Sequence, residues 1–193
     1  MRTEKAIGII VLLAIVLKFS HIPGSSILLV FSLYLLTAIY FAGAFYFFSD
    51  KSIKRQNLPL SIGSGIALSV VPMAVLFRLQ YWSGNSTLLL TAVLTAAIVL
   101  GLVIYMRKKS TEDLQTYYKN MYTRALVLFL ASAIFLAIPM STLISLQYRY
   151  DPEMARLKIQ HYSEPRNLEF KRQHDQYMRQ HENTLYQKPE GEK

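Results

Sequence analysis

The sequence has no cysteine and few charged residues, which make up 17% of its 193 positions. Without cysteine there can be no disulfides, thiol nucleophiles or thiolate metal ligands. Acidic residues are especially scarce: only four Asp and Glu occur up to Leu146, and none lies inside a long apolar segment. Proton relays and cation sites within a membrane usually need such groups, so the sequence gives no sign of either.

The motifs of common enzyme sites are also absent: there is no phosphate-binding loop, no His-Glu-x-x-His and no Gly-x-Ser-x-Gly. Of four histidines only His21 lies near an apolar segment, so haem ligation between spans has no support. His174 and His181 share a helix face with Tyr177, and a solvated face explains this pattern better than a metal site. We therefore expect a non-enzymatic protein with no cofactor and no metal.

Long apolar segments are abundant, with 52% hydrophobic residues in the chain. A bilayer core about 30 Å thick needs about 20 apolar residues per helix. Five segments approach this length: 6–22, 26–48, 58–79, 87–106 and 125–146. They predict an all-α, polytopic transmembrane helix bundle embedded in a lipid bilayer. The first segment is the weakest, and the basic residues before it also fit a signal peptide, although no small-x-small cleavage site follows.

This pattern divides the chain into four parts. They are a first transmembrane hairpin (1–50), a second transmembrane hairpin (51–109), an interfacial link with the fifth transmembrane helix (110–147) and a polar helical tail (148–193). Ser110-Thr111-Glu112-Asp113 and Asp151-Pro152-Glu153 are typical helix starts. The apolar residues of the tail are too few for an autonomous core, so we expect it to become ordered by docking on a partner or on the membrane surface. The candidate docking residues are Phe170, Tyr177 and Met178.

Basic residues are unequally distributed between the two sides that the spans define. Outside the tail, ten Lys and Arg fall on the side of the N-terminus and only Lys18 and Arg78 on the other. Because short cytoplasmic loops carry the excess of basic residues, this asymmetry predicts a cytoplasmic N-terminus in a bacterial inner membrane; five spans then place the tail in the periplasm. The net charge of +9 is thus explained by topology and requires no nucleic acid partner.

A turn occurs twice, 60 residues apart, once in each predicted hairpin. The matching residues are candidate functional residues: Lys18, His21, Pro23 and Gly24 in the first turn, and Arg78, Tyr81, Trp82 and Gly84 in the second. Their matched order indicates a duplicated hairpin, although any tight extracellular hairpin has similar features. Lys18 and Arg78 end their helices, where a cation that complements the helix dipole stabilises by about 1 kcal/mol or less. We expect the hydroxyl residues after each glycine, Ser25 or Ser26 and Ser86 or Thr87, to cap the next helix.

Small residues four apart mark predicted helix-packing faces, because they let helices approach closely in lipid. They are Ser61, Gly65 and Ser69 in the third span and Ala133 and Ala137 in the fifth. Pro72 and Pro139 lie inside predicted spans, so each is expected to kink its helix.

The first hairpin resembles that of the GldL-type gliding-motility proteins of the Bacteroidota. The match comprises Lys18-Phe19-x-His21-x-Pro23-Gly24 and the stretch 35–45, Leu-Leu-Thr-Ala-Ile-Tyr-Phe-Ala-Gly-Ala-Phe. The resemblance implies an inner-membrane protein that works with membrane partners in type 9 secretion and gliding. The family has a glutamate after the threonine of the second helix, and here Thr37 is followed by Ala38. The resemblance therefore implies the hairpin architecture and not proton flow.

The function that these patterns favour is that of a membrane subunit or assembly factor of a larger bacterial envelope complex, related to secretion or motility. Other membrane proteins of that complex are the expected partners. The alternative is a small transporter or channel component, in which Lys18 and Arg78 line an outward-facing basic vestibule for an anion. An integral membrane enzyme ranks third, because no acid, histidine and serine converge at one depth.

Overall fold

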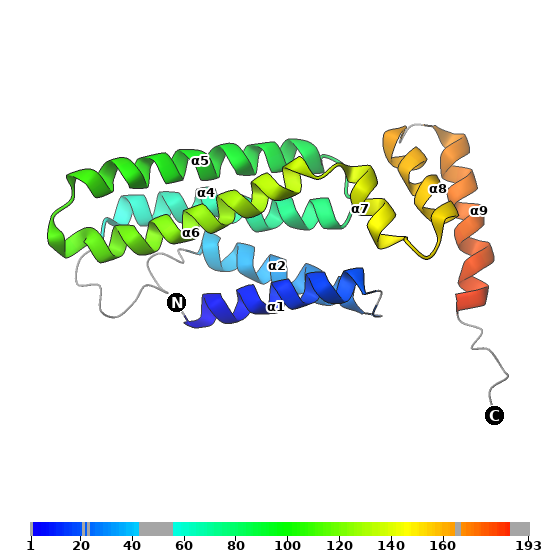
Figure 1. Cartoon of the computed structure of the whole chain (residues 1–193), viewed down its shortest axis with the longest axis horizontal. Helices are drawn as coiled ribbons and strands as arrows, with labels where there is room; N and C mark the ends of the chain where they lie inside the picture. The colour runs from blue at the N-terminus through cyan, green and yellow to red at the C-terminus, as the bar shows by residue number, and fades with distance from the viewer. Residues whose placement is uncertain (1, 21, 23, 43–55, 165–166, 186–193) are drawn as a thin grey trace, which may run out of the picture. The chain divides into compact units, whose positions relative to one another are not determined.

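The computed structural model describes the backbone of all residues except 1, 21, 23, 43–55, 165–166 and 186–193; the side chains of 2–3 and 181–185 are likewise outside the description. The described part contains eight α-helices and no strand, as the apolar segments predict (Figure 1). The chain forms two compact units, unit 1 (Met1–Ile138) and unit 2 (Pro139–Lys193).

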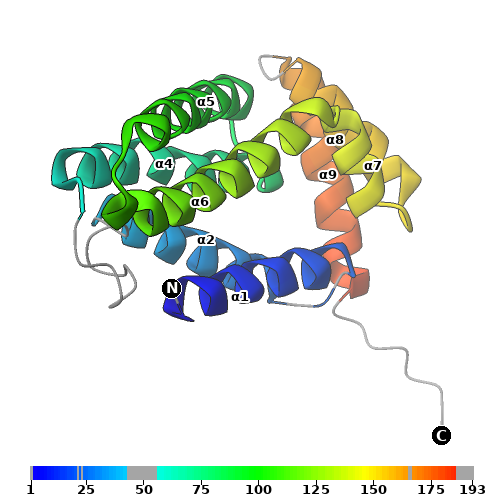
Figure 2. The same cartoon turned by 60° about the vertical axis from the view of Figure 1, so that its left-hand side comes forward.

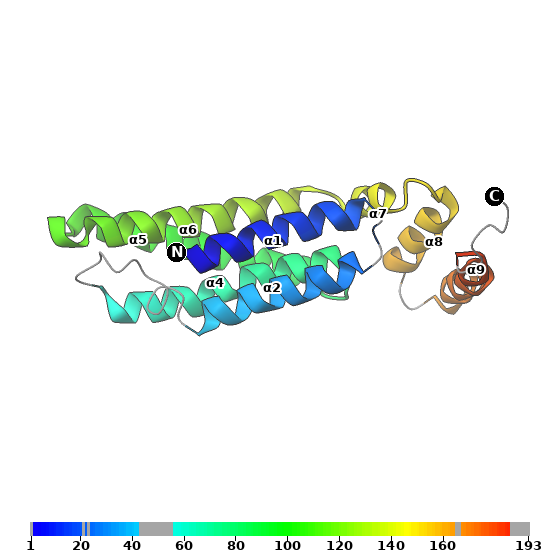
Figure 3. The same cartoon turned by 90° about the horizontal axis from the view of Figure 1, so that it is seen from below.

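Unit 1 is a bundle whose helices run along one common direction (Figure 3). Its helices are α1 (Arg2–Phe19), α2 (Ser25–Phe41), α4 (Leu58–Leu79), α5 (Asn85–Lys109) and α6 (Glu112–Ala137). Helix α4 is central, because it packs against α2, α5 and α6, whereas α1 packs mainly on α2 (Figure 2). Its core residues include Leu68, Val71 and Leu76, which are almost completely buried.

Three of the described helices, α4, α5 and α6, are long and apolar enough to cross a membrane. Helix α1 has 18 residues and is apolar from Ala6 to Leu17, but it carries charges at both ends. The described helix α2 is apolar and 17 residues long. The end of the span expected at 26–48 lies outside the described residues from position 43 onward.

Local sequence explains where helices α4 and α6 begin. Asn57 caps α4, since its side chain accepts a hydrogen bond from the Leu60 amide at 3.3 Å, and Pro59 follows in the first turn. Helix α6 begins at Glu112, where the sequence predicted a helix start, and continues without interruption into the apolar segment. The expected interfacial link and fifth span therefore form one helix.

The helix expected to form the fifth span, α6, ends earlier than predicted. Pro72 lies inside α4, as expected, but Pro139 does not lie within a kinked helix: α6 ends at Ala137, and α7 (Met140–Gln147) begins after the proline. Ile138 adopts an extended backbone conformation, which the following proline favours. The boundary of unit 1 consequently falls at Ile138 and not near residue 147.

Unit 2 consists of α7, α8 (Pro152–Ser163) and α9 (Leu168–Leu185), with α8 packed on both of its neighbours. Asp151 caps α8 by accepting a hydrogen bond from the Met154 amide at 3.0 Å, so the helix start predicted there is confirmed. The second break, expected at Pro165, corresponds to the gap between α8 and α9, although residue 165 itself lies outside the described residues.

Candidate functional site

The two repeated turns lie side by side at one end of the unit 1 bundle. The Lys18 ammonium donates a hydrogen bond to Gln80 Oε1 at 3.2 Å and lies 5.8 Å from the centroid of the Tyr81 ring. Gln80 Nε2 in turn donates to the Ser26 carbonyl at 3.4 Å. The end of α1 and the start of α2 are thereby joined to the α4–α5 turn, and Lys18 is only 4% exposed. We call this group the turn cluster, comprising Lys18, Ser26, Gln80 and Tyr81.

The backbone of the two turns explains their matched glycines. Gly24 and Gly84 both have positive φ, 81° and 78°, and each directly precedes the next helix. This left-handed conformation favours glycine. Tyr81 is also left-handed, with φ 58°. The hydroxyl caps predicted after each glycine are wrong, because Gly24 and Gly84 occupy the cap positions without a side-chain hydrogen bond.

The remaining turn residues are only partly described. Trp82 packs edge-on against Phe77, with ring centroids 5.0 Å apart, and remains 44% exposed. Such an amphipathic ring at a helix end suits a membrane interface. His21 and Pro23, which the sequence also singled out, lie outside the described residues.

Arg78 joins the ends of three helices. Its Nη1 donates to Asn85 Oδ1 at 3.0 Å and Ser86 Oγ at 3.4 Å, and its Nη2 donates to the Ile138 carbonyl at 2.6 Å. The guanidinium thus connects the C-terminus of α4, the N-terminus of α5 and the residue after α6, with only 5% exposure. A helix-dipole contribution alone understates the effect of this residue, because hydrogen bonds to a charged group contribute about 1.5–3 kcal/mol each.

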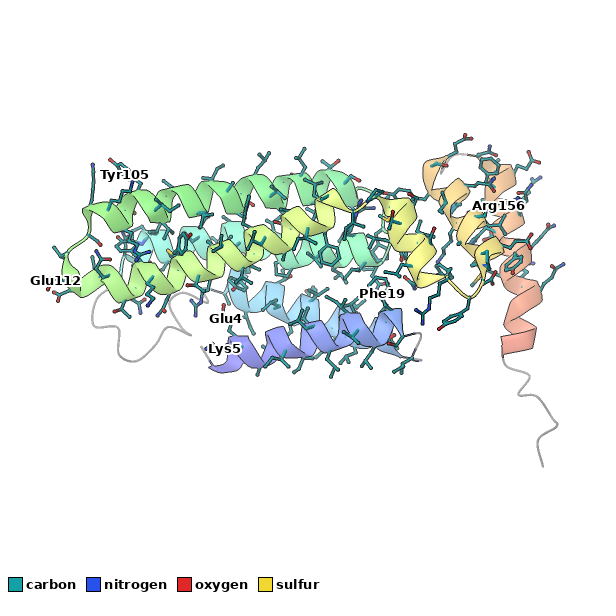
Figure 4. All side chains as sticks on the ribbon, in the orientation of Figure 1. Glu4, Lys5, Phe19, Tyr105, Glu112 and Arg156 are labelled. Carbon is teal, nitrogen blue, oxygen red and sulfur yellow. The ribbon has the colours of Figure 1, made fainter. Side chains whose placement is uncertain are left out.

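A second polar cluster lies at the opposite end of α1, and sequence reasoning missed it. Glu4 lies near the N-terminal end of α1 (Figure 4). It forms an ion pair with Arg124 Nη2 at 2.7 Å, and its other carboxylate oxygen accepts a hydrogen bond from the Tyr40 hydroxyl at 2.5 Å. The side chains of Arg124 and Glu4 are 7% and 13% exposed. We call these three residues the acid cluster. It connects α1, α2 and α6.

A sequence signal for the acid cluster existed but was ambiguous. Glu4 is the only acidic residue before Asp50, and Arg124 directly precedes the apolar part of α6. Both positions fall on the predicted cytoplasmic side, where charges are ordinarily solvated. Only the packing of α1 near α6 distinguishes a buried pair from two surface charges.

The predicted packing faces differ in burial. Ser61, Gly65 and Ser69 are all buried in α4. Ser61 Oγ lies 2.6 Å from the Tyr117 hydroxyl of α6, which itself donates to the Asn57 carbonyl at 3.1 Å.

The small residues of α6 that are buried differ from those the sequence predicted. Ala133 is half-buried and Ala137 is exposed, whereas Ala125 and Ser132 are buried. The contact face of α6 within unit 1 is thus not the predicted Ala133–Ala137 stripe.

The predicted docking residues of α9 face different surroundings. Phe170 and Tyr177 are half-buried, whereas Met178 is 42% exposed. The Tyr177 hydroxyl donates to Asp151 at 2.8 Å, and this hydrogen bond raises the pKa of Tyr177. His174 stacks on His161 of α8, with ring centroids 5.8 Å apart. Tyr177, one of the three predicted docking residues, therefore contributes to the α8–α9 hairpin itself.

The described residues contain no group of three or more His, Cys, Asp or Glu that could hold a metal ion.

Comparison with known proteins gives no match: no family model, curated protein sequence or solved structure is significantly similar to the chain. The described part of the chain is thus a helical bundle in which three helices are long and apolar enough to cross a membrane.

Proposed function

We propose that the protein is a non-enzymatic membrane subunit or assembly factor of a larger bacterial envelope complex, of the kind that secretion or gliding motility uses. The observation that carries this proposal is the burial of both outward-side cations. Lys18 and Arg78 are 4% and 5% exposed, and each bonds to acceptors within the chain. Cations engaged in this way stabilise the bundle and do not line an open anion vestibule, so the geometry favours a scaffold over a channel.

The proposed topology has five spans, formed by α1, the segment that begins with α2, α4, α5 and α6. The N-terminus is in the cytoplasm of a bacterial cell and unit 2 is in the periplasm. The basic residues at the end of α5, Arg107, Lys108 and Lys109, support this orientation together with those preceding α4.

A reporter that is active only outside the cytoplasm tests this topology. We expect activity when alkaline phosphatase is fused after Glu192 and none when it is fused after Asn57, because the two positions lie on opposite sides in a five-span arrangement. A fusion active only in the cytoplasm, such as green fluorescent protein, serves as the reciprocal control at both positions. Cytoplasmic fluorescence at Glu192 would contradict the odd number of spans.

Unit 2 is the proposed partner-docking element. It has its own internal packing, and two apolar side chains of α9, Leu168 and Met178, remain 68% and 42% exposed. The hydrogen bond from Tyr177 to Asp151 stabilises the hairpin that presents them. A helical hairpin with exposed apolar residues among charges is suited to contact with another protein of the complex.

We expect the full chain, extracted in a mild detergent, to retain membrane proteins of the complex that mass spectrometry identifies. Truncation after Tyr150 should release them while the spans remain inserted. The sharper variant is Leu168→Ser with Met178→Ser, which removes apolar contact area and leaves the Tyr177–Asp151 hydrogen bond in place. Gln173→Ser with Gln180→Ser is the matched control, since both glutamines are exposed polar residues of α9.

Retention of the same partners by the truncated chain would place the interaction within the membrane, with the bundle surface as the binding face, and would refute docking through unit 2. If the apolar variant pair and the control variant pair lose the partners equally, the substitutions disturb the folding of α9 and do not report on a specific contact. A chain that recovers no partner at all would argue against the subunit assignment.

A further inference from the structure

A pocket of about 290 Å³ lies beside the acid cluster, between α1, α2 and α6. Its lining changes from polar to apolar along all three helices. On α1, Glu4 and Lys5 are followed one turn later by Gly8; on α6, Asn120 and Arg124 are followed by Val127 and Leu128. Helix α2 runs in the opposite direction, and there Tyr40 is preceded one turn earlier by Leu36. One end of the pocket is therefore polar and the other apolar.

This gradient has the polarity of a lipid at the cytoplasmic face of a membrane. One helical turn is about 5.4 Å, so the polar and apolar levels are separated by the distance between a headgroup linkage and the first methylenes of an acyl chain. The polar level coincides with the N-terminal end of α1, near Glu4 and Lys5 (Figure 4). In the proposed topology this end lies at the cytoplasmic headgroup region.

The charges of the polar level favour an anion. Glu4 already accepts from Arg124 and Tyr40, so its carboxylate is compensated within the cluster. Lys5 is exposed at the pocket, and the described part of the chain provides no hydrogen bond or ion pair for its ammonium. Asn120, which also lines the pocket, adds an amide donor one helical turn before Arg124 on α6. Among the described residues that line the pocket, Lys5 and Arg124 outnumber the single carboxylate of Glu4, and this net positive charge favours a phosphate.

We propose that this pocket binds an anionic glycerophospholipid of the cytoplasmic leaflet. The phosphate is held by Lys5 and the Asn120 amide beside Arg124, and one acyl chain lies against Gly8, Leu36 and Val127. The inference rests on the proposed membrane topology, but it requires no partner protein. By occupying the space between α1 and α6, the lipid adds apolar contacts between two helices that otherwise meet chiefly through the Glu4–Arg124 pair.

Native mass spectrometry of the full chain in detergent tests the proposal with defined lipids. We expect one dioleoyl phosphatidylglycerol to be retained in preference to dioleoyl phosphatidylcholine. Lys5→Gln should weaken retention of phosphatidylglycerol about fivefold, the effect of one basic residue at a membrane surface. Glycerol 3-phosphate and inorganic phosphate form separate arms and should compete poorly, because neither has an acyl chain for the apolar level.

Filling the pocket is the decisive variant. A Cβ at Gly8 meets no heavy atom within 4 Å, so Gly8→Leu can extend into the pocket without displacing the helix. We expect it to abolish retention of phosphatidylglycerol. Gly101→Leu is the matched control, because Gly101 of α5 is equally open and does not line this pocket. If Gly8→Leu does not fold, Val127→Trp fills the pocket from α6, with exposed Leu130→Trp as its control.

Equal retention of the two lipids, or equal loss in Gly8→Leu and Gly101→Leu, would overturn the proposal, since both results are expected of annular lipid. Glycerol 3-phosphate or phosphate competing as well as the lipid would overturn it in favour of a soluble anion. The lipid measurement and the co-purification of partner proteins test different proposals. If the full chain retains the lipid but co-purifies with no partner, only the subunit assignment is contradicted. If it co-purifies with partners but retains no lipid, only the lipid pocket is contradicted.

Discussion

Arg124→Gln is expected to destabilise the unit 1 bundle by about 3–5 kcal/mol, the cost of removing one partner from a buried ion pair. The side chain of Glu4 is 13% exposed and accepts from Arg124 at 2.7 Å. Without the guanidinium, the carboxylate is left with the Tyr40 hydroxyl as its remaining partner in this cluster, and desolvation then disfavours its charge. Reversible unfolding by denaturing detergent, followed by tryptophan fluorescence, measures the difference in the free energy of unfolding.

The double variant Glu4→Gln/Arg124→Gln separates the ion pair from simple loss of packing. Two amides at these positions can still form a hydrogen bond and leave no buried charge, so the double variant should recover much of the stability lost in Arg124→Gln. Lys119→Gln on the exposed face of α6 is the surface control and should change stability by about 0.5 kcal/mol or less. Equal effects of Arg124→Gln and Lys119→Gln would show that the pair contributes little.

Arg78→Gln is expected to cost about 2–4 kcal/mol, well above the value for a cation at an exposed helix end. Three acceptors, two at the α5 N-terminus and one in the residue after α6, each lose the hydrogen bond from the guanidinium, and Asn85 is completely buried. Arg78→Lys retains the charge but not the planar fork of donors, so it should recover only part of the loss. The measurement is the same detergent-unfolding transition.

Arg107→Gln provides the matched comparison, because Arg107 is also a cation in the last turn of its helix but is exposed. Its effect should remain within the dipole contribution of about 1 kcal/mol. If Arg78→Gln and Arg107→Gln are equally mild, Arg78 is only a helix-end anchor. Salt-sensitive anion binding by the purified protein that Lys18→Gln/Arg78→Gln abolishes would instead support the vestibule alternative.

Local sequence determined the helical class, the helix starts at Glu112 and Pro152, and the two glycine turns. These features follow from interactions within a few residues: apolar runs favour helices that bury their own backbone in lipid, Asp151 satisfies the first amides of α8, and glycine alone tolerates a left-handed φ readily. The match between the turns at 18–24 and 78–84 was likewise visible, and both glycines adopt the same conformation.

The tertiary structure decided which polar side chains meet. Lys18 reaches Gln80, Arg78 reaches the Ile138 carbonyl, and Glu4 reaches Arg124. Each contact depends on how far one helix is rotated and shifted against another, and apolar periodicity constrains neither when almost every face is hydrophobic. Pro139 illustrates the same limit: a proline can kink a membrane helix or end it. Here the helix ends. The Ile138 carbonyl accepts a hydrogen bond from the buried Arg78 guanidinium, whereas in a continuous helix it would accept one from a backbone amide of the next turn.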